Sequence, residues 1–244
     1  NRRGRVLKSR DAGASFEEVY IVPSDGYAVF DLFVHPQDEN FVIIGTGAGG
    51  VLETRDGGIR WRVIHWFSDS VTQITPDPAD PNHIYANVAG SALWRTDDGG
   101  ETWNDVTPRL EANPQEIFPY KPPTPFGVLG EFWGKGDMGK FLVDPFFFNV
   151  LFVGTREGVL RSDNGGATWR VLNILIPPGT LPIQAVARDP HTFNTVLVGV
   201  NGELYTTGDG GENWSFTPLP VAGRIKDIII HPQRPEIIFV LLGR

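Results

Sequence analysis

The chain has 244 residues, of which 41% are hydrophobic and 20% charged, and its formal net charge is −8 at pH 7. This acidic balance argues against a general nucleic-acid or anionic-membrane binder, because both need a basic face. The chain has no cysteine, which excludes disulfides, thiolate metal sites and cysteine nucleophiles. No apolar run reaches the roughly 18–20 residues of a membrane span.

Short apolar runs and turn residues alternate along the whole chain. In chain order, two runs flank a first turn phrase within residues 1–22, and two more lie within 224–244 at the end. Between them, four units hold four runs each: 29–66, 71–106, 138–172 and 182–217. The runs are rich in β-branched and aromatic residues and are bounded by Gly, Pro, Asp or Asn, which is typical of strands. We therefore expect an all-β protein.

One turn phrase recurs five times, with the pattern Ser/Thr-x-Asp/Asn-x-Gly-x-x-Trp/Phe. A short acidic side chain can accept hydrogen bonds from the amides of its own turn, and glycine supplies the positive φ of a tight hairpin. One copy has asparagine in place of the acid, which indicates that geometry matters and charge does not. We predict a structural role for the third residue of each phrase: Asp11, Asp56, Asp98, Asn164 and Asp209.

Units of about 40–50 residues with four strands are typical of β-propeller blades. The sequence predicts one domain, residues 1–244, folded as a five-bladed β-propeller with four-stranded antiparallel blades. The strands of 224–244 and 1–22 supply two strands each to the fifth blade, so the N- and C-terminal strands close the ring in a 2+2 arrangement. Such closure removes exposed strand edges.

The phrase resembles the Asp-box, or BNR, repeat of WD40/YVTN/BNR-like propellers. Such repeats occur in sialidases, sortilin-type receptors, xyloglucan-degrading hydrolases and photosystem II assembly factors. The stretch DPADPNHIYANVAGSALWRTDDGG is similar to the last two groups in particular. The resemblance implies that the box is a structural hairpin, and it specifies fold much more than function.

The inserted loop 107–137 is the clearest departure from the repeat. It joins two predicted blades on the face opposite the turn phrases, where propellers usually bind ligands. A lid that binds carbohydrate or protein uses aromatic side chains with a few charges. Alternatively, the loop is a flap that packs its own aromatics on the rim. The candidate binding residues in the loop are Tyr120, Phe126, Phe132, Trp133 and Lys135.

Further binding candidates are expected on the same face. They are His65 and Trp66 after one blade, Arg156 and Asn201 in tight turns, and Arg2 and Arg3 near the chain end. The arginines would form a positive patch able to hold a carboxylate or sulfate. The alternatives are that Trp66 belongs to the strand core and that the terminal arginines are simply solvated.

Catalytic signatures are missing. No histidine spacing suggests a metal site, and neither a Gly-x-Ser-x-Gly elbow nor a phosphate loop is present. A glycosidase needs two acids about 5–10 Å apart, for which Glu131 and Asp137 are the candidates. The resemblance to sialidases and xyloglucan hydrolases would also require an arginine triad, or two larger propellers facing a cleft. These departures count against hydrolysis.

We therefore expect a non-enzymatic binding or assembly scaffold, which holds a protein or carbohydrate partner on the axial face beside the inserted loop. One alternative is a glycoside hydrolase or lyase of the sialidase or xyloglucanase type. Another is a structural subunit of a surface assembly. No cofactor, metal or nucleic-acid partner is expected. The expected location is secreted, periplasmic or at the cell surface.

Overall fold

The structure is a computed structural model, and it describes residues 3–77, 80–89, 92–108, 138–144, 147–155, 158–174, 183, 185–192 and 194–243. Within these ranges, every regular element is a β-strand. No helix in the described part is long and apolar enough to cross a membrane. The chain forms two compact units, Asn1–Thr107 and Pro108–Arg244.

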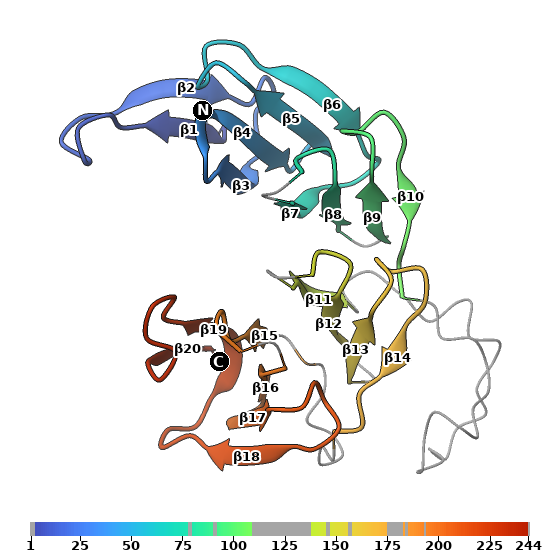
Figure 1. Ribbon diagram of the computed structural model, residues 1–244. Helices are drawn as coiled ribbons and strands as arrows, with labels where there is room; N and C mark the ends of the chain where they lie inside the picture. Colours follow the sequence, from blue (N-terminus) through green and yellow to red (C-terminus); the bar gives the residue numbers. More distant parts are fainter. Residues whose placement is uncertain are drawn as a thin grey trace. The chain divides into compact units, whose positions relative to one another are not determined.

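The N-terminal unit contains three antiparallel sheets (Figure 1). The first has two strands, β1 (Arg5–Lys8) and β2 (Glu17–Ile21). The second has four strands: β3 (Val29–His35), β4 (Asp38–Thr46), β5 (Gly50–Thr54) and β6 (Arg62–Trp66). The third also has four: β7 (Val71–Pro76), β8 (Ile84–Val88), β9 (Ala92–Thr96) and β10 (Asn104–Asp105).

The C-terminal unit also contains three antiparallel sheets. One comprises β11 (Met138–Val143), β12 (Leu151–Thr155), β13 (Val159–Ser162) and β14 (Arg170–Val171). The next comprises β15 (Ala185–Arg188), β16 (Val196–Val200), β17 (Glu203–Thr207) and β18 (Ser215–Pro218). The last has two strands, β19 (Arg224–Ile230) and β20 (Ile238–Gly243).

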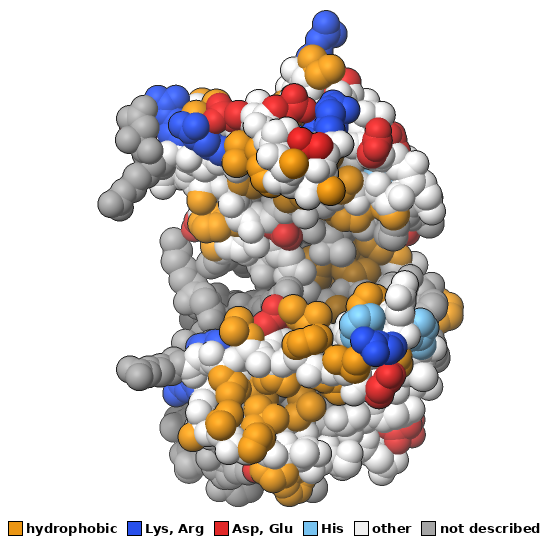
Figure 2. Space-filling model, turned by 90° about the vertical axis from the view of Figure 1, so that its left-hand side faces the viewer, with side chains coloured by type: hydrophobic (Ala, Val, Ile, Leu, Met, Phe, Trp, Pro, Cys, Tyr) orange, Lys and Arg blue, Asp and Glu red, His pale blue; other side chains and the backbone are white. Residues whose placement is uncertain are grey.

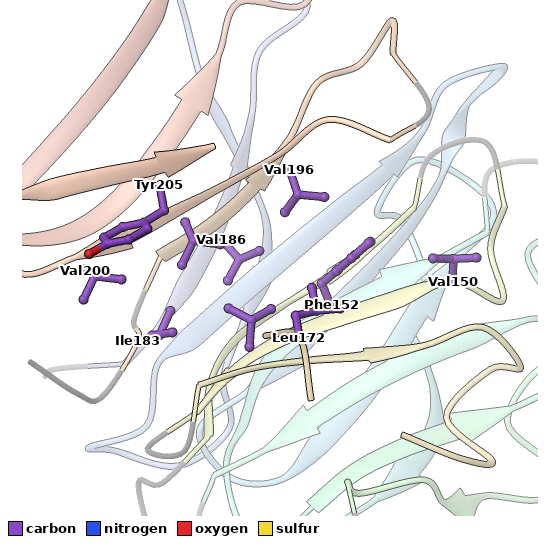
Figure 3. Packing of buried hydrophobic residues seen from close by; sticks show 10 residues of the cluster. Val150, Phe152, Leu172, Ile183, Val186, Val196, Val200 and Tyr205 are labelled. Atoms are coloured by element: carbon purple, nitrogen blue, oxygen red, sulfur yellow. The ribbon is translucent and has the colours of Figure 1, made fainter. Parts of the chain in front are cut away.

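Neighbouring sheets within a unit bury their apolar faces against each other, which is the dominant favourable term in folding. Figure 3 shows such a cluster, in which Phe152 of β12 lies near Val186 of β15 and Val196 of β16. The second strands of the sheets are central and buried along their whole length in β8, β12 and β16. Gly154 permits this close stacking, because a Cβ there would lie 2.6 Å from the carbonyl oxygen of Ile183.

The all-β class and the four-stranded antiparallel sheets are confirmed. The ring of five blades and its closure are not, because β1–β2 and β19–β20 each form a sheet of two strands. The inserted loop 107–137 lies outside the described residues except for its first two positions.

Candidate functional site

The five turn phrases share one hydrogen-bond pattern, which Asp98 illustrates. Its carboxylate accepts a bond from the Thr96 hydroxyl at 2.6 Å and from the backbone N–H of Thr102 at 2.9 Å. The Thr96 hydroxyl in turn accepts the N–H of Gly100 at 2.9 Å. The Thr102 hydroxyl and N–H and the Thr96 hydroxyl hold the pKa of Asp98 well below its usual range. This carboxylate is therefore fully engaged in folding its own turn.

The same backbone bond recurs in the other four phrases, from the N–H of the residue four positions on. Its length is 2.8 Å in one copy and 2.9 Å in three, with these acceptors: Asp11, Asp56, Asn164 and Asp209. The Ser15 hydroxyl and N–H lower the pKa of Asp11 to about 2. Asn164 makes the equivalent bond without a charge, so hydrogen-bond geometry is sufficient for the turn.

An open pocket of about 410 Å³ lies beside the turn between β16 and β17. Asn201 forms this turn with a φ of 55°, a left-handed conformation that asparagine tolerates. The opposite wall is the segment Pro218–Ala222, which is largely apolar. A mainly apolar wall with a few polar groups is typical of small-molecule sites.

Glu203 supplies a carboxylate to this pocket. It accepts a hydrogen bond from the Tyr205 hydroxyl at 2.9 Å. Burial, assisted by this carboxylate, raises the pKa of Tyr205 to about 12, so the phenol stays a neutral donor at pH 7. Sequence reasoning missed Glu203. Aligning the four complete sheets would have found it, because the same strand position holds Gly50, Ala92 and Gly158 in the other three.

His65 and Trp66, at the end of β6, have different surroundings. The His65 ring lies 4.5 Å from Phe67 and 5.7 Å from Trp103, centroid to centroid. Burial against these rings lowers the pKa of His65. Trp66 is 54% exposed, so its ring is accessible at the surface.

Arg3 forms an ion pair with Asp25 at 2.6 Å, with both side chains partly exposed. The structure therefore gives Arg3 an acidic partner. The remaining candidates lie outside the described residues: Arg2, Tyr120, Phe126, Glu131, Phe132, Trp133, Lys135, Asp137 and Arg156. Among the described residues, no group of three or more His, Asp or Glu side chains is placed to hold a metal ion.

Comparison with curated proteins finds xyloglucanases. A xyloglucanase from a Paenibacillus species is 24% identical over 178 residues, which cover 66% of this chain and 16% of that protein. An oligoxyloglucan-reducing end-specific xyloglucanase from Emericella nidulans is 26% identical over 170 residues, or 64% and 19% of the two chains. The chain thus spans less than a fifth of the length of these two relatives. No family model matches the sequence.

Solved structures with a similar fold are propeller proteins. A GH74 enzyme from Niastella koreensis aligns with a TM-score of 0.67 at 18% identity, over 99% of this chain and 40% of that one. YCF48 from Cyanidioschyzon merolae aligns with a TM-score of 0.59 at 19% identity, over 91% and 65% of the two chains. At these identities the likeness supports the propeller fold alone.

The curated relatives contradict the non-enzymatic scaffold that we expected from the sequence. They are named as hydrolases, so the glycoside hydrolase alternative fits better. The scaffold prediction treated the lack of a catalytic set in one small propeller as a sign against catalysis. That reasoning was wrong, because a chain spanning 16% to 19% of an enzyme need not carry the complete set.

Proposed function

We propose that this chain is part of a glycoside hydrolase of the xyloglucanase type, which acts on a xyloglucan-like polysaccharide. The similarity to two curated xyloglucanases, over 66% and 64% of the chain, is the observation that carries the proposal. A polymeric plant-type substrate is met outside the cell, which agrees with a secreted, periplasmic or cell-surface location.

The surface features agree with a carbohydrate ligand. The pocket at Asn201 and Glu203 combines an apolar wall with an amide and a carboxylate, and Trp66 offers an exposed ring. The apolar wall and the Trp66 ring suit the apolar face of a sugar, and the amide and carboxylate suit its hydroxyl groups. Within the inserted loop, Glu131 and Asp137 remain our proposed acid pair for bond cleavage, since a glycosidase needs two carboxyl groups about 5–10 Å apart.

A substrate screen tests this function. We expect the purified chain to release reducing ends from xyloglucan but not from a sialoside polymer, and to lose turnover on Glu131→Gln or Asp137→Asn substitution. Asp163→Asn, a change at an exposed acid in the variable second position of a turn phrase, serves as the control and should leave turnover unchanged. A folded chain that neither binds nor cleaves xyloglucan would overturn the proposal.

We further propose that the turn phrases are Asp-box repeats and that β1–β2 completes the sheet of β19–β20 as a fifth blade. The four complete sheets support this through a shared register between their second and third strands. In each of these sheets, the residue two positions before the box Asp or Asn ends the third strand. It pairs with the same position of the second strand, as in Val42↔Thr54 and Val196↔Thr207. Applied to the terminal strands, this register places Ile238 opposite Ser9 and Val240 opposite Leu7.

The exposure of β20 also supports closure. Phe239 is 60% exposed, although the same strand position is at most 3% exposed in the four complete sheets, at Ile43, Tyr85, Phe152 and Leu197. Hydrophobic side chains gather on the surface of the C-terminal unit (Figure 2). Large exposed apolar patches usually mark an interaction surface.

A cysteine cross-link tests closure directly, because the chain has no native cysteine. We expect Leu7→Cys with Val240→Cys to oxidise within one chain, since residues directly opposite in an antiparallel pair lie about 4.5–5.5 Å apart. Leu7→Cys with Val221→Cys is the mismatched control and should stay reduced. Cross-linking only between chains would assign the exposed face of β20 to a second copy and overturn closure.

A further inference from the structure

The second turn phrase, residues 54–61, departs from the other four at Arg60. The other copies have a small polar residue at this position, and its side chain bonds to the box Asp or Asn. These bonds measure 2.5–2.9 Å and involve Ser15, Thr102, Thr168 and Asn213. Within the part of the chain that the structure describes, Arg60 is the one residue at this position without such a side-chain bond. Arg60 thus gives up a bond that the other phrases keep.

A second departure lies beside it, at Glu53. The same strand position holds a cation or threonine in the other sheets: Lys8, Arg95, Arg161 and Thr206. The Glu53 side chain is only 6% exposed, and it accepts hydrogen bonds from Arg55 at 3.2 and 3.3 Å and from Arg62 at 2.7 and 3.1 Å. One buried carboxylate therefore holds two guanidinium groups in place.

Both of these guanidinium groups remain open to solvent, since the side chains of Arg55 and Arg62 are 56% and 69% exposed. Each has more N–H donors than the two that Glu53 engages. The Arg55 guanidinium is also held 4.3 Å above the centroid of the Phe41 ring. The donors are thus oriented in advance, which reduces the entropy lost on binding a ligand.

The three arginines line one open pocket of about 320 Å³, together with Trp61 and Thr54. Glu53 and Asp56 are the only acids in its lining, so the pocket has one excess positive charge in a chain of net charge −8. Its volume is at the lower end of the roughly 300–1,000 Å³ of ligand sites, which suits one sugar-sized molecule.

Trp61 differs from its counterparts Trp103 and Trp214 too. Trp103 and Trp214 donate their indole N–H to a glycine carbonyl of their own turn. Trp61 donates instead to the carbonyl of Val19 in β2 at 2.8 Å, and its ring lies 5.2 Å from that of Tyr20. The aromatic wall of the pocket is therefore anchored on a neighbouring sheet.

We propose that this pocket binds the carboxylate of an acidic sugar, with Arg55, Arg60 and Arg62 as its donors. Guanidinium groups match the planar geometry of a carboxylate with paired hydrogen bonds. The aromatic wall and the small volume favour a single sugar ring over an extended acidic peptide. The inference does not rest on the proposed hydrolysis, because it needs only this pocket.

Calorimetric titration with D-glucuronate tests the proposal, and D-glucose serves as the uncharged twin. We expect saturable binding of glucuronate, no binding of glucose at the same concentration, and weakening when salt is raised, since exposed charges are screened. Arg60→Thr and Arg62→Ser should each weaken binding about tenfold, the range for a charge-assisted hydrogen bond. Arg170→Ser, at the position equivalent to Arg62 in β14, makes the same charge change and should have no effect.

Arg60→Thr also separates binding from folding, because threonine occupies this position in two other phrases. The variant should keep or raise the thermal midpoint while losing affinity. No saturable binding of glucuronate, or equal binding by Arg60→Thr, would overturn the proposal. Equal affinity for sulfate would identify an adventitious ion site only, and tighter binding of an acidic peptide would assign the pocket to protein; either result overturns the sugar assignment.

Discussion

Asp144 and Arg188 form a buried ion pair in the C-terminal unit, between the end of β11 and the end of β15. The two side chains are 2% and 1% exposed. The Asp144 carboxylate also accepts the backbone N–H of Phe147 at 3.0 Å. Replacing Asp144 by asparagine would keep the volume and this turn bond but remove the carboxylate charge that faces the buried Arg188 guanidinium.

The cost follows from this burial. Breaking a buried pair by removing one partner typically destabilises by about 3–5 kcal/mol, compared with a total unfolding free energy of about 5–15 kcal/mol for a domain. For a unit of this size, between the 100- and 150-residue classes, 1 kcal/mol corresponds to roughly 4 °C in thermal midpoint. Asp144→Asn should therefore lower the midpoint by more than about 12 °C. Replacing both partners, as in Asp144→Leu with Arg188→Met, should recover most of the loss.

Urea unfolding followed by tryptophan fluorescence measures the free energy of unfolding of the unchanged chain, of Asp144→Asn and of the double variant. Asp97→Asn is the matched control. Its ion pair with Arg95 at 2.7 Å is the surface counterpart, because the Asp97 side chain is 47% exposed. Exposed pairs contribute about 0–1 kcal/mol. If Asp144→Asn costs no more than Asp97→Asn, the buried pair does not stabilise the unit as argued.

Three further changes test other parts of the structure. Gly100→Ala should lower the thermal midpoint, because Gly100 has a φ of 96° and a Cβ there would clash with Ile64, whereas Gly208→Ala, which meets nothing within 4 Å, should be neutral. The pKa of Asp11 is lowered from 3.8 to about 2, so its contribution to stability is present above pH 4 and is lost as the pH falls through 2. Asp11→Asn should therefore reduce the pH dependence of urea unfolding between pH 4 and 2, and an unchanged pH profile would contradict this expectation. Trp66→Ala should change the free energy of unfolding by no more than about 0.5 kcal/mol, as is usual at exposed positions. It should nevertheless weaken the binding of a xyloglucan oligosaccharide in titration calorimetry, and unaltered binding would remove Trp66 from the site.

The strands were predictable because their signals are local. Whether an apolar run forms a strand is decided by the Gly, Pro or Asp within a few residues of it, and the turn phrase occurs five times in the sequence. Thus the sheet of β3–β6 lies within the unit predicted at 29–66, and that of β7–β10 within 71–106. The third residue of each turn phrase could also be assigned to a turn, because asparagine at position 164 already indicated that charge is dispensable.

Other features depend on residues far apart in the chain. Asp144 matched the repeated turn position in the sequence, and only the neighbouring sheet shows that Arg188 faces it. The sequence likewise does not show that Glu53 is buried beneath two arginines. Nor does it show that Glu203 and the end of β18 with the segment after it line one pocket.

Comparing equivalent positions of the repeated sheets distinguishes residues that stabilise the fold from residues that bind a ligand. A box residue that bonds back to its own turn satisfies a local requirement, so selection for stability alone would keep it in every copy. Arg60 lacks that bond, and in the same sheet Glu53 reverses the usual charge and Trp61 takes a partner in β2. Independent losses would be scattered among the sheets, whereas these three departures line a single pocket. A shared ligand explains why the three departures occur together, whereas random substitution of surface residues does not.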